Sequence, residues 1–415
     1  FTAAKVMWEF TNADDADLGN VTGRPKILKM RTGANTYKWF AVFGSGVNNY
    51  VSQDGVYSTT GNPALFILDL SKAAGTAWAL GTNYYKISLP VDSTASTTLP
   101  TGLLNFSAAL GLDKAVTYIF MGDLHGNLWK LDFAAAATAA NWTINDLSYF
   151  KQGTSNLPIP MFIAKDTNGH RQPISAAPNI IFGPVTDSYY IVFGTGKYLE
   201  IGDKATTSAQ SVYMVYDNGT TTPDSTASTA TSAISDRLRL KLGTADAKTG
   251  VVTVPAFTVG RATTNTDTDN PRSGWVADLP NSGERQISNG TVFGDKIVFG
   301  SLIPAVSSAT ACSASGGGGN QYTLNILTGN GTSVGSSVGI LGEPLVEEIS
   351  SATSYSASDS TGRRTKTITS QVFQQGSNGI AAGSGSSTNT LTRTVLVGRL
   401  TWRQINNYQD LKNAP

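Results

Sequence analysis

The sequence predicts an all-β fold, an irregular β-propeller with long loop insertions. A short unit recurs along the chain: a hydrophobic strand that ends in glycine, a loop, and a second strand that is usually closed by aspartate. The first strands of four such units end at Gly44, Gly122, Gly194 and Gly300. A sheet unit of this kind cannot bury both faces alone, so copies are expected to stack radially around an axis.

The distances between these glycines exceed one regular propeller repeat of roughly 40 to 50 residues. Each interval is therefore expected to hold an enlarged blade, or two blades of which one is degenerate. We expect a single domain over residues 1–415 with about seven blades in the full domain, the first of them truncated before Phe1. Loop insertions are expected near residues 204–236, 313–320, 350–366 and 374–390.

Residues 116–133, VTYIFMGDLHGNLWKLDF, give the clearest hairpin pattern in the chain. The first strand is β-branched and aromatic, glycines mark a polar turn, and the second strand alternates apolar with polar residues. In GTGKY (194–198) the spacing of a phosphate loop is absent, so its glycines indicate turn geometry. The predicted structural motif residues are Gly122, Asp123, Gly126, Asn127, Trp129, Asp132, Gly194 and Gly196.

Composition and charge exclude several classes of protein. Lys and Arg number 30 and Asp and Glu 29, which leaves no basic excess to neutralise a nucleic-acid backbone. No window approaches 18 consecutive apolar residues, so no membrane span is predicted. Charged residues make up only 14% of the chain and 43 residues are glycine, a balance typical of secreted β-proteins with exposed polar loops.

The sequence offers no convincing catalytic group. Cys312 is the single cysteine, so no internal disulfide can form. As a nucleophile it would need a base nearby, and His125 and His170 are the only histidines. We therefore predict no catalytic and no cofactor-binding residue.

One stretch resembles the start of a calcium loop. Asn265, Asp267 and Asp269 alternate as the first three ligands of such a loop would. However, Asn270 and Pro271 follow where the turn glycine belongs, and Val276 stands where the closing glutamate should be. Asp267 and Asp269 are kept as the calcium candidates.

Several segments in a fixed order give the chain a family resemblance. They are WEFTNADDADLGNVTGRP, KWFAVFGSGVNN, PALFILDL, YIFMGDLHGNLWKLDF, RQPISAAPNI, YYIVFGTGKYLE, AQSVYMVYD, GWVADLPNSGER and LTWRQI. From Trp8 to Ile405 this order resembles the C-terminal β-propeller of the PilC/PilY family. The resemblance implies an exported, outer-membrane-associated protein at the tip of a type IV pilus. It also implies minor pilins as partners, a role in pilus extension and twitching motility, and adhesion to abiotic or host-cell receptors.

The resemblance also implies a calcium loop directly before the GDLxGNLW strand. Here that stretch, residues 105–116, has Asp113 as its only acid, and one carboxylate cannot supply the six to eight oxygens that calcium takes. Regulation by calcium is therefore not expected at this position. The working surfaces are expected in the loops at 217–236 and 350–366 and at exposed strand edges, where β-augmentation could recruit a pilin.

Two other functions remain open. One is a generic secreted ligand-binding propeller that is unrelated to pili. The other is a quinoprotein-type dehydrogenase, which needs calcium, an aspartate base and an enclosed ring cofactor, and commonly a vicinal disulfide that one cysteine cannot form.

Overall fold

The computed structural model describes residues 8–48, 60–97, 99–135, 138–153, 155–224, 230–266, 268–305, 317–351, 355–356, 364–382 and 390–397. Strands dominate these ranges. The one α-helix within them is the single turn α1 (Ile144–Leu147), and 3-10 turns lie at η3 (Ala95–Thr97), η4 (Ala139–Asn141), η5 (Ile201–Lys204) and η6 (Arg237–Arg239). The prediction of an all-β fold is confirmed.

The chain divides into two compact units. The first comprises residues 1–344 and 375–379, and the second comprises residues 345–374 and 380–415. The prediction of one domain over 1–415 stays a prediction, as does the blade count.

The first sheet of the first unit is antiparallel, in the order β1-β2-β4-β5. Its strands are β1 (Lys26–Gly33), β2 (Thr36–Gly44), β4 (Ala64–Asp69) and β5 (Tyr84–Ser88). The second sheet has the order β3-β6-β7-β8-β9, and the predicted hairpin supplies its third and fourth strands. Its strands are β3 (Gly46–Asn48), β6 (Thr101–Leu110), β7 (Val116–Asp123), β8 (Asn127–Asp132) and β9 (Phe162–Ile163).

The third sheet is larger, with ten strands in the order β10-β11-β12-β15-β13-β14-β19-β18-β17-β16. Its strands are β10 (Asn179–Phe182), β11 (Tyr189–Gly194), β12 (Ser211–Asp217), β13 (Lys241–Ala245), β14 (Val251–Thr253), β15 (Gly274–Asp278), β16 (Thr291–Phe293), β17 (Lys296–Gly300), β18 (Asn320–Asn325) and β19 (Gly331–Gly335). The β13–β15 pair is parallel. The two outer strands approach each other, because the Ala177 amide donates to Asn289 Oδ1 at 2.9 Å. The sheet is therefore nearly closed on itself.

The C-terminal sheet has the order β20-β21-β22, with β23 also paired to β21. Its strands are β20 (Leu341–Ser351), β21 (Arg364–Gly376), β22 (Gly379–Ala382) and β23 (Thr390–Val397). Only parts of the insertions predicted at 350–366 and 374–390 lie within the described residues.

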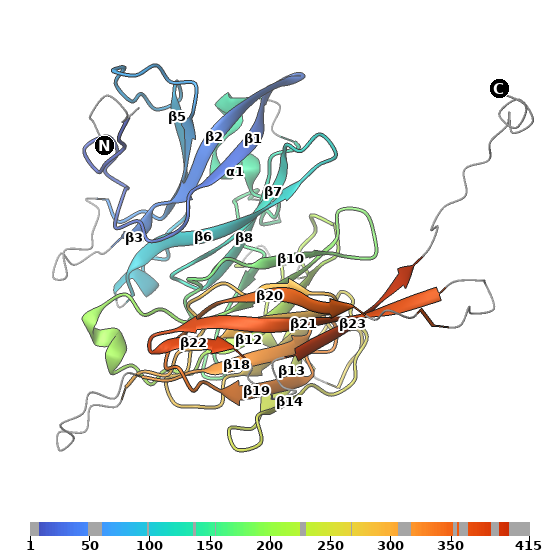
Figure 1. The fold of residues 1–415 in the computed structure, drawn as a ribbon. Coiled ribbons are helices and arrows are strands. Elements are labelled where there is room, and N and C mark those ends of the chain that lie inside the picture. The colour runs from blue at the N-terminus through green and yellow to red at the C-terminus, as the bar shows by residue number, and fades with distance from the viewer. Residues whose placement is uncertain are drawn as a thin grey trace, which may run out of the picture. The chain divides into compact units, whose positions relative to one another are not determined.

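The core lies between sheets that face one another, as Figure 1 shows for the blue and cyan strands. Successive side chains of a strand point to opposite faces of its sheet, so one strand can contribute to two packing interfaces. On β7, Ile119 and Met121 join the first and second sheets, whereas Tyr118 and Phe120 face the third. On β12, Tyr213 faces the second sheet and its neighbours Val212 and Met214 pack toward Phe299 and Leu324 on β17 and β18. Stacking of successive sheets is the packing that a propeller requires.

Gly122, at the end of β7, is a point of close approach. A Cβ built there would lie 2.1 Å from Ile174 Cγ2 and 2.4 Å from Ile174 Cβ. Both atoms belong to the side chain of Ile174, which is fully buried between the second and third sheets. The methyl group of an alanine at position 122 would therefore overlap this side chain.

We predict that Gly122→Ala lowers the free energy of unfolding by about 1–3 kcal/mol, as overpacking of a core does. Urea unfolding followed by tryptophan fluorescence measures the loss. Gly153→Ala is the matched control, because a Cβ there meets nothing within 4 Å and should leave stability unchanged. Ile174→Ala combined with Gly122→Ala should cost less than the two single losses together. Strictly additive losses would contradict the steric account.

Candidate functional surface

The turn between β7 and β8 is built around the carboxylate of Asp123. This fully buried group accepts hydrogen bonds from the backbone amides of His125 and Asn127, both at 2.9 Å. Asn127 Nδ2 and Trp129 Nε1 donate to its other oxygen at 2.8 and 3.1 Å. Burial raises the pKa of Asp123, and the bonds from Asn127 oppose that rise. The structure thus brings three of the eight predicted motif residues, Asp123, Asn127 and Trp129, together in one internal cluster of hydrogen bonds.

A second copy of this turn follows at Asp166, which sequence reasoning missed. Asp166 Oδ1 accepts the amides of Asn168 and His170 at 2.8 Å each, the same spacing as in the first turn. The shared signal is Asp-x-x-Gly, with glycine at φ 78° and 83° in the two copies. Arg171, next in the chain, donates to the carbonyl of His125 at 2.9 Å. The two turns are therefore locked together.

The remaining motif residues also have structural places. Asp132 caps its own turn by accepting the amides of residues 134 and 135. A Cβ at Gly194 would lie 2.0 Å from Gln286 Oε1. Gly196 has a φ of 129°, and a Cβ there would lie 2.3 Å from Arg285 Cβ. These contacts agree with turn geometry and close backbone approach.

A buried ion pair joins the second and third sheets. Lys130 Nζ on β8 lies 2.6 Å from Asp217 Oδ2 at the end of β12, and both side chains are fully buried. The ammonium also lies 3.4 Å from the ring centroid of Tyr149 and 4.2 Å from that of Tyr118. Burial lowers the pKa of Lys130 and raises that of Asp217, and each partner's charge opposes the other's shift. The ion pair and the rings of Tyr118 and Tyr149 thus link the second sheet to the third.

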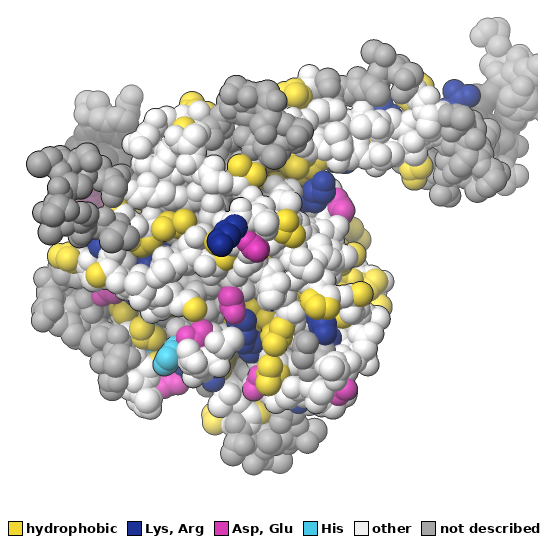
Figure 2. Space-filling view, turned by 90° about the horizontal axis from the view of Figure 1, so that it is seen from below, with side chains coloured by type: hydrophobic (Ala, Val, Ile, Leu, Met, Phe, Trp, Pro, Cys, Tyr) yellow, Lys and Arg dark blue, Asp and Glu magenta, His cyan; other side chains and the backbone are white. Residues whose placement is uncertain are grey.

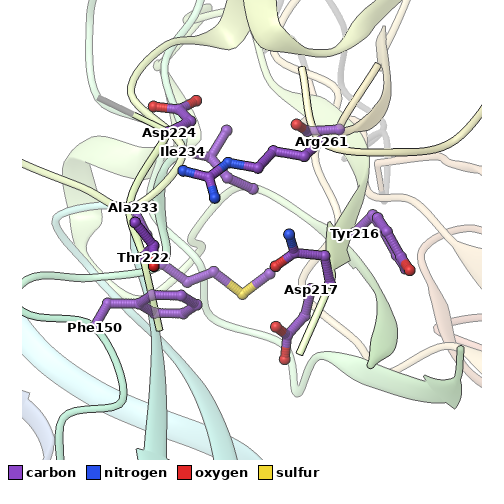
Figure 3. A pocket seen from close by; sticks show the side chains of 11 residues that line it. Phe150, Tyr216, Asp217, Thr222, Asp224, Ala233, Ile234 and Arg261 are labelled. Atoms are coloured by element: carbon purple, nitrogen blue, oxygen red, sulfur yellow. The ribbon is translucent and has the colours of Figure 1, made fainter. Parts of the chain in front are cut away.

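Asp217 also borders a small pocket next to the loop that follows β12 (Figure 3). The pocket has a volume of about 20 Å³, which is room for roughly one water molecule. Its other carboxylate, Asp224, lies 3.2 Å from Arg239 Nε, and Arg261 donates to the carbonyl of Pro223. Burial raises the pKa of Asp224. A pocket of this size cannot hold a ring cofactor.

The loop at 217–236 differs from the exposed loop that its composition predicts. The amides of Ala233 and Ile234 donate to the carbonyls of Pro160 and Met161 at 2.9 and 2.8 Å. Ser232, Ala233 and Ile234 are buried, so the prediction is wrong for this part of the loop. Ala and Ile within a Thr/Ser-rich stretch were the available signal. Residues 225–229 lie outside the described residues.

The calcium candidates are only partly visible, because Asp267 lies outside the described residues, as does Cys312. Asp269 accepts a hydrogen bond from the Thr264 hydroxyl. Arg272 donates to the carbonyls of Thr264 and Thr266 at 3.3 and 2.8 Å. A guanidinium thus binds two backbone carbonyls of this loop. Within the described residues no three His, Cys, Asp or Glu side chains gather as a metal site.

The turn before β7, where the resemblance implies calcium, is also bound by cations of the chain. Lys29 Nζ on β1 donates to the Asp113 carbonyl at 3.0 Å, and Arg31 lies 4.0 Å from the Asp113 carboxylate. The same carboxylate accepts the Ala115 amide at 3.0 Å. This turn is held closed by protein groups.

On the face shown in Figure 2, some Lys and Arg side chains lie beside Asp or Glu, and no large single-sign patch forms there. Across the described part of the chain, no helix is long and apolar enough to cross a membrane.

Comparison with known proteins decides the family. Residues 3–249 match the family model described as the PilY1 beta-propeller domain. The chain belongs to this family. The prediction of a β-propeller is confirmed, as is the resemblance to PilY proteins.

Two relatives and one solved structure extend the match. A type IV pilus biogenesis factor PilY1 homolog of Xylella fastidiosa is 28% identical over 336 residues, which are 79% of this chain and 20% of that protein. PilY1 of Pseudomonas aeruginosa is 30% identical over 224 residues, 52% of this chain and 17% of that protein. The crystal structure of the Pseudomonas aeruginosa PilY1 C-terminal domain superposes with a TM-score of 0.59 at 20% identity, covering 92% of this chain and 76% of that one, and shows the shared fold. The chain spans about a fifth of the length of these curated relatives.

We predict that Lys130→Met costs about 3–5 kcal/mol of unfolding free energy, because Asp217 is left charged and buried without its partner. Arg24→Met is the control: Arg24 lies 3.2 Å from Glu343 and the two side chains are 78% and 37% exposed, so its loss should cost less than about 1 kcal/mol. Denaturant unfolding of both variants makes the comparison. Equal losses of unfolding free energy in the two variants would contradict the prediction that the buried ion pair contributes more to stability than the exposed one.

We also predict that the described turns need no calcium. A chelator such as EGTA should shift the melting temperature by less than about 1 °C, since Lys29 and Arg272 supply the positive charge at both candidate positions. Differential scanning calorimetry with EGTA and with excess calcium measures this. Stabilisation by several degrees on adding calcium would reveal a site and contradict the expectation.

Proposed function

We propose that this chain is a non-enzymatic module of a type IV pilus tip protein, located at the cell surface. In this role it supports pilus assembly and extension and adhesion to surfaces or host cells. The observation that carries the proposal is the family match over residues 3–249, together with two relatives whose names are those of type IV pilus biogenesis factors.

The way in which the buried acids are bonded supports a scaffold over an enzyme. Asp123 is enclosed by four donors and Asp217 by Lys130. Glu284 accepts hydrogen bonds from Ser301, Asn320 and Tyr322, each at 2.5 to 2.8 Å. A general base must reach a substrate proton, whereas these carboxylates bond groups of the fold itself.

The edge strands of the C-terminal sheet support binding of a minor pilin. β23 pairs with β21 alone within the described residues, so its other edge carries backbone groups that a further strand can bond. β20 carries Pro344, Glu347 and Glu348, residues that discourage edge pairing. We therefore place the pilin strand at β23. The receptor-binding part of the surface is proposed in the loops at 218–223 and 350–366.

Deletion of the gene that encodes the chain should abolish most surface pili and adherent cells, and the intact gene should restore both. Electron microscopy of sheared filaments, with gold-labelled antibody, should find the chain at one filament end. Unchanged piliation and adhesion after deletion would defeat the proposal.

The strand-pairing step has its own variant. The backbone N–H groups of successive residues in a strand point to opposite sides. Proline at both Arg393 and Thr394 therefore removes one outward-pointing N–H, whichever of the two residues faces outward. The expected result is loss of minor pilins from pull-downs of the full protein. Unchanged recovery of minor pilins would rule out β23 as the pairing edge.

A further inference from the structure

The pair formed by Lys130 and Asp217 holds an amine and a carboxyl group together in a site that solvent does not reach. Nζ of Lys130 lies 2.6 Å from Oδ2 of Asp217, and both side chains are 0% exposed. Two groups that are fixed in contact react intramolecularly, without the entropic cost of an encounter. An amine and a carboxylic acid condense to an amide with release of water, and a site without bulk water protects that product from hydrolysis.

The ammonium group of Lys130 has few hydrogen-bond partners. It carries three N–H donors, but Asp217 is its only hydrogen-bond acceptor among the described residues. Its other close neighbours are the rings of Tyr149 and Tyr118, whose centroids lie 3.4 and 4.2 Å from Nζ. Ring faces attract a cation, but they do not replace the oxygens that a buried ammonium needs. The charged form of this lysine is therefore costly.

Burial shifts both groups toward their neutral forms. It lowers the pKa of Lys130 and raises the pKa of Asp217, although the charge of each partner opposes the shift. Only the neutral amine has the lone pair that attacks a carbonyl carbon, and burial is one way in which a lysine becomes a nucleophile. A protonated carboxyl group, in turn, is a better electrophile than a carboxylate.

The second carboxylate oxygen of Asp217 faces a backbone donor. The Gly219 amide donates to Oδ1 at 3.1 Å. Attack on the carboxyl carbon moves negative charge onto this oxygen, and an N–H group that already points at it stabilises that charge, as in an oxyanion hole. Oδ2, which faces Lys130, is then the oxygen that leaves.

We propose that Lys130 and Asp217 become joined by an intramolecular isopeptide bond. A proton first passes from Nζ to Oδ2, and the Nζ lone pair then attacks Cγ. The N–C bond forms, the bond between Cγ and Oδ2 breaks, and Oδ2 leaves as water with a second proton from Nζ. The amide nitrogen keeps one hydrogen, and no atom is oxidised or reduced. A cavity that Asp217 borders has room for roughly one water molecule.

Lys86 has a different arrangement and serves as the internal control. Its ammonium lies 2.9 Å from Asp15 Oδ1 and 2.8 Å from Asp17 Oδ2, and its side chain is 19% exposed. Burial lowers the pKa of Lys86, but hydrogen bonds with Asp17 and Asp15 outweigh burial, and the pKa is raised overall. This lysine stays charged, so it forms no amide.

The bond ties two sheets together. Lys130 lies on β8 of the second sheet and Asp217 on β12 of the third, 87 positions further along the chain. A cross-link over so long a loop restricts the unfolded chain, as a disulfide does. Its biological meaning, resistance to pulling force along a pilus, rests on the function proposed above. The bond itself is a property of the purified chain.

Mass spectrometry of the purified 415-residue chain tests the bond. The intact chain should be lighter than its sequence mass by one water molecule. Trypsin does not cleave after an acylated lysine, so the digest should contain a branched peptide that joins residues 115–151 to residues 205–237. Cleavage after Lys86 should be normal.

Two variants remove the bond in different ways. Lys130→Arg keeps the positive charge of the ion pair but replaces the amine by a guanidinium, which is always protonated. Asp217→Ala removes the carboxyl group. Both variants should have their full sequence mass, and neither digest should contain a branched peptide. The parent chain is measured directly, so the test does not depend on whether these variants fold.

A parent chain of full sequence mass, cleaved after Lys130, would overturn the inference. Loss of water without the branched peptide would overturn it as well, because an aspartate elsewhere can lose water as a cyclic imide. Failure of the pilus proposal has a different sign, namely normal piliation and adhesion in the deletion strain, and it leaves the mass of the purified chain unchanged.

Discussion

The structure depends on one constraint: the central strands carry apolar side chains on both faces, and each face must be covered by other strands. Alternation along β7 and β12 directs neighbouring side chains to opposite interfaces, so a single strand contributes to two cores. Fully burying a large apolar side chain is worth about 1.5–3 kcal/mol, and each interface collects many of them. The polar clamps at Asp123 and between Lys130 and Asp217 then fix how the sheets meet.

Much of this was readable in the sequence because it is local. The hairpin at 116–133, the glycine at its close approach and the turn at Gly126 follow from period-two alternation and turn chemistry. The parallel pairing of β13 with β15 and the burial of Ala233 and Ile234 did not follow, since both depend on partners far along the chain. The engagement of loop oxygens by Lys29 and Arg272 was equally hidden, because a loop's acids are visible in a sequence and its bound cations are not.

The polar interior and the loop surface have different characters. Inside, acids such as Asp123 and Glu284 are bonded by groups of the fold, and their geometry serves packing. At the loops, side chains such as His170, which is 78% exposed, lie where a partner can reach them. This division agrees with a rigid scaffold that presents its recognition groups at its periphery.

The ion pair between Lys130 and Asp217 has a consequence for how the family can diverge. The two residues lie 87 positions apart in the chain, yet neither charge has another countercharge at hydrogen-bonding distance among the described residues. Exchange of either residue for a neutral one leaves the other charge buried without a partner. Simultaneous exchange of both for apolar residues of similar volume is often tolerated. Drift at these positions is therefore expected to proceed in pairs, and the two alignment columns should change identity together across the family.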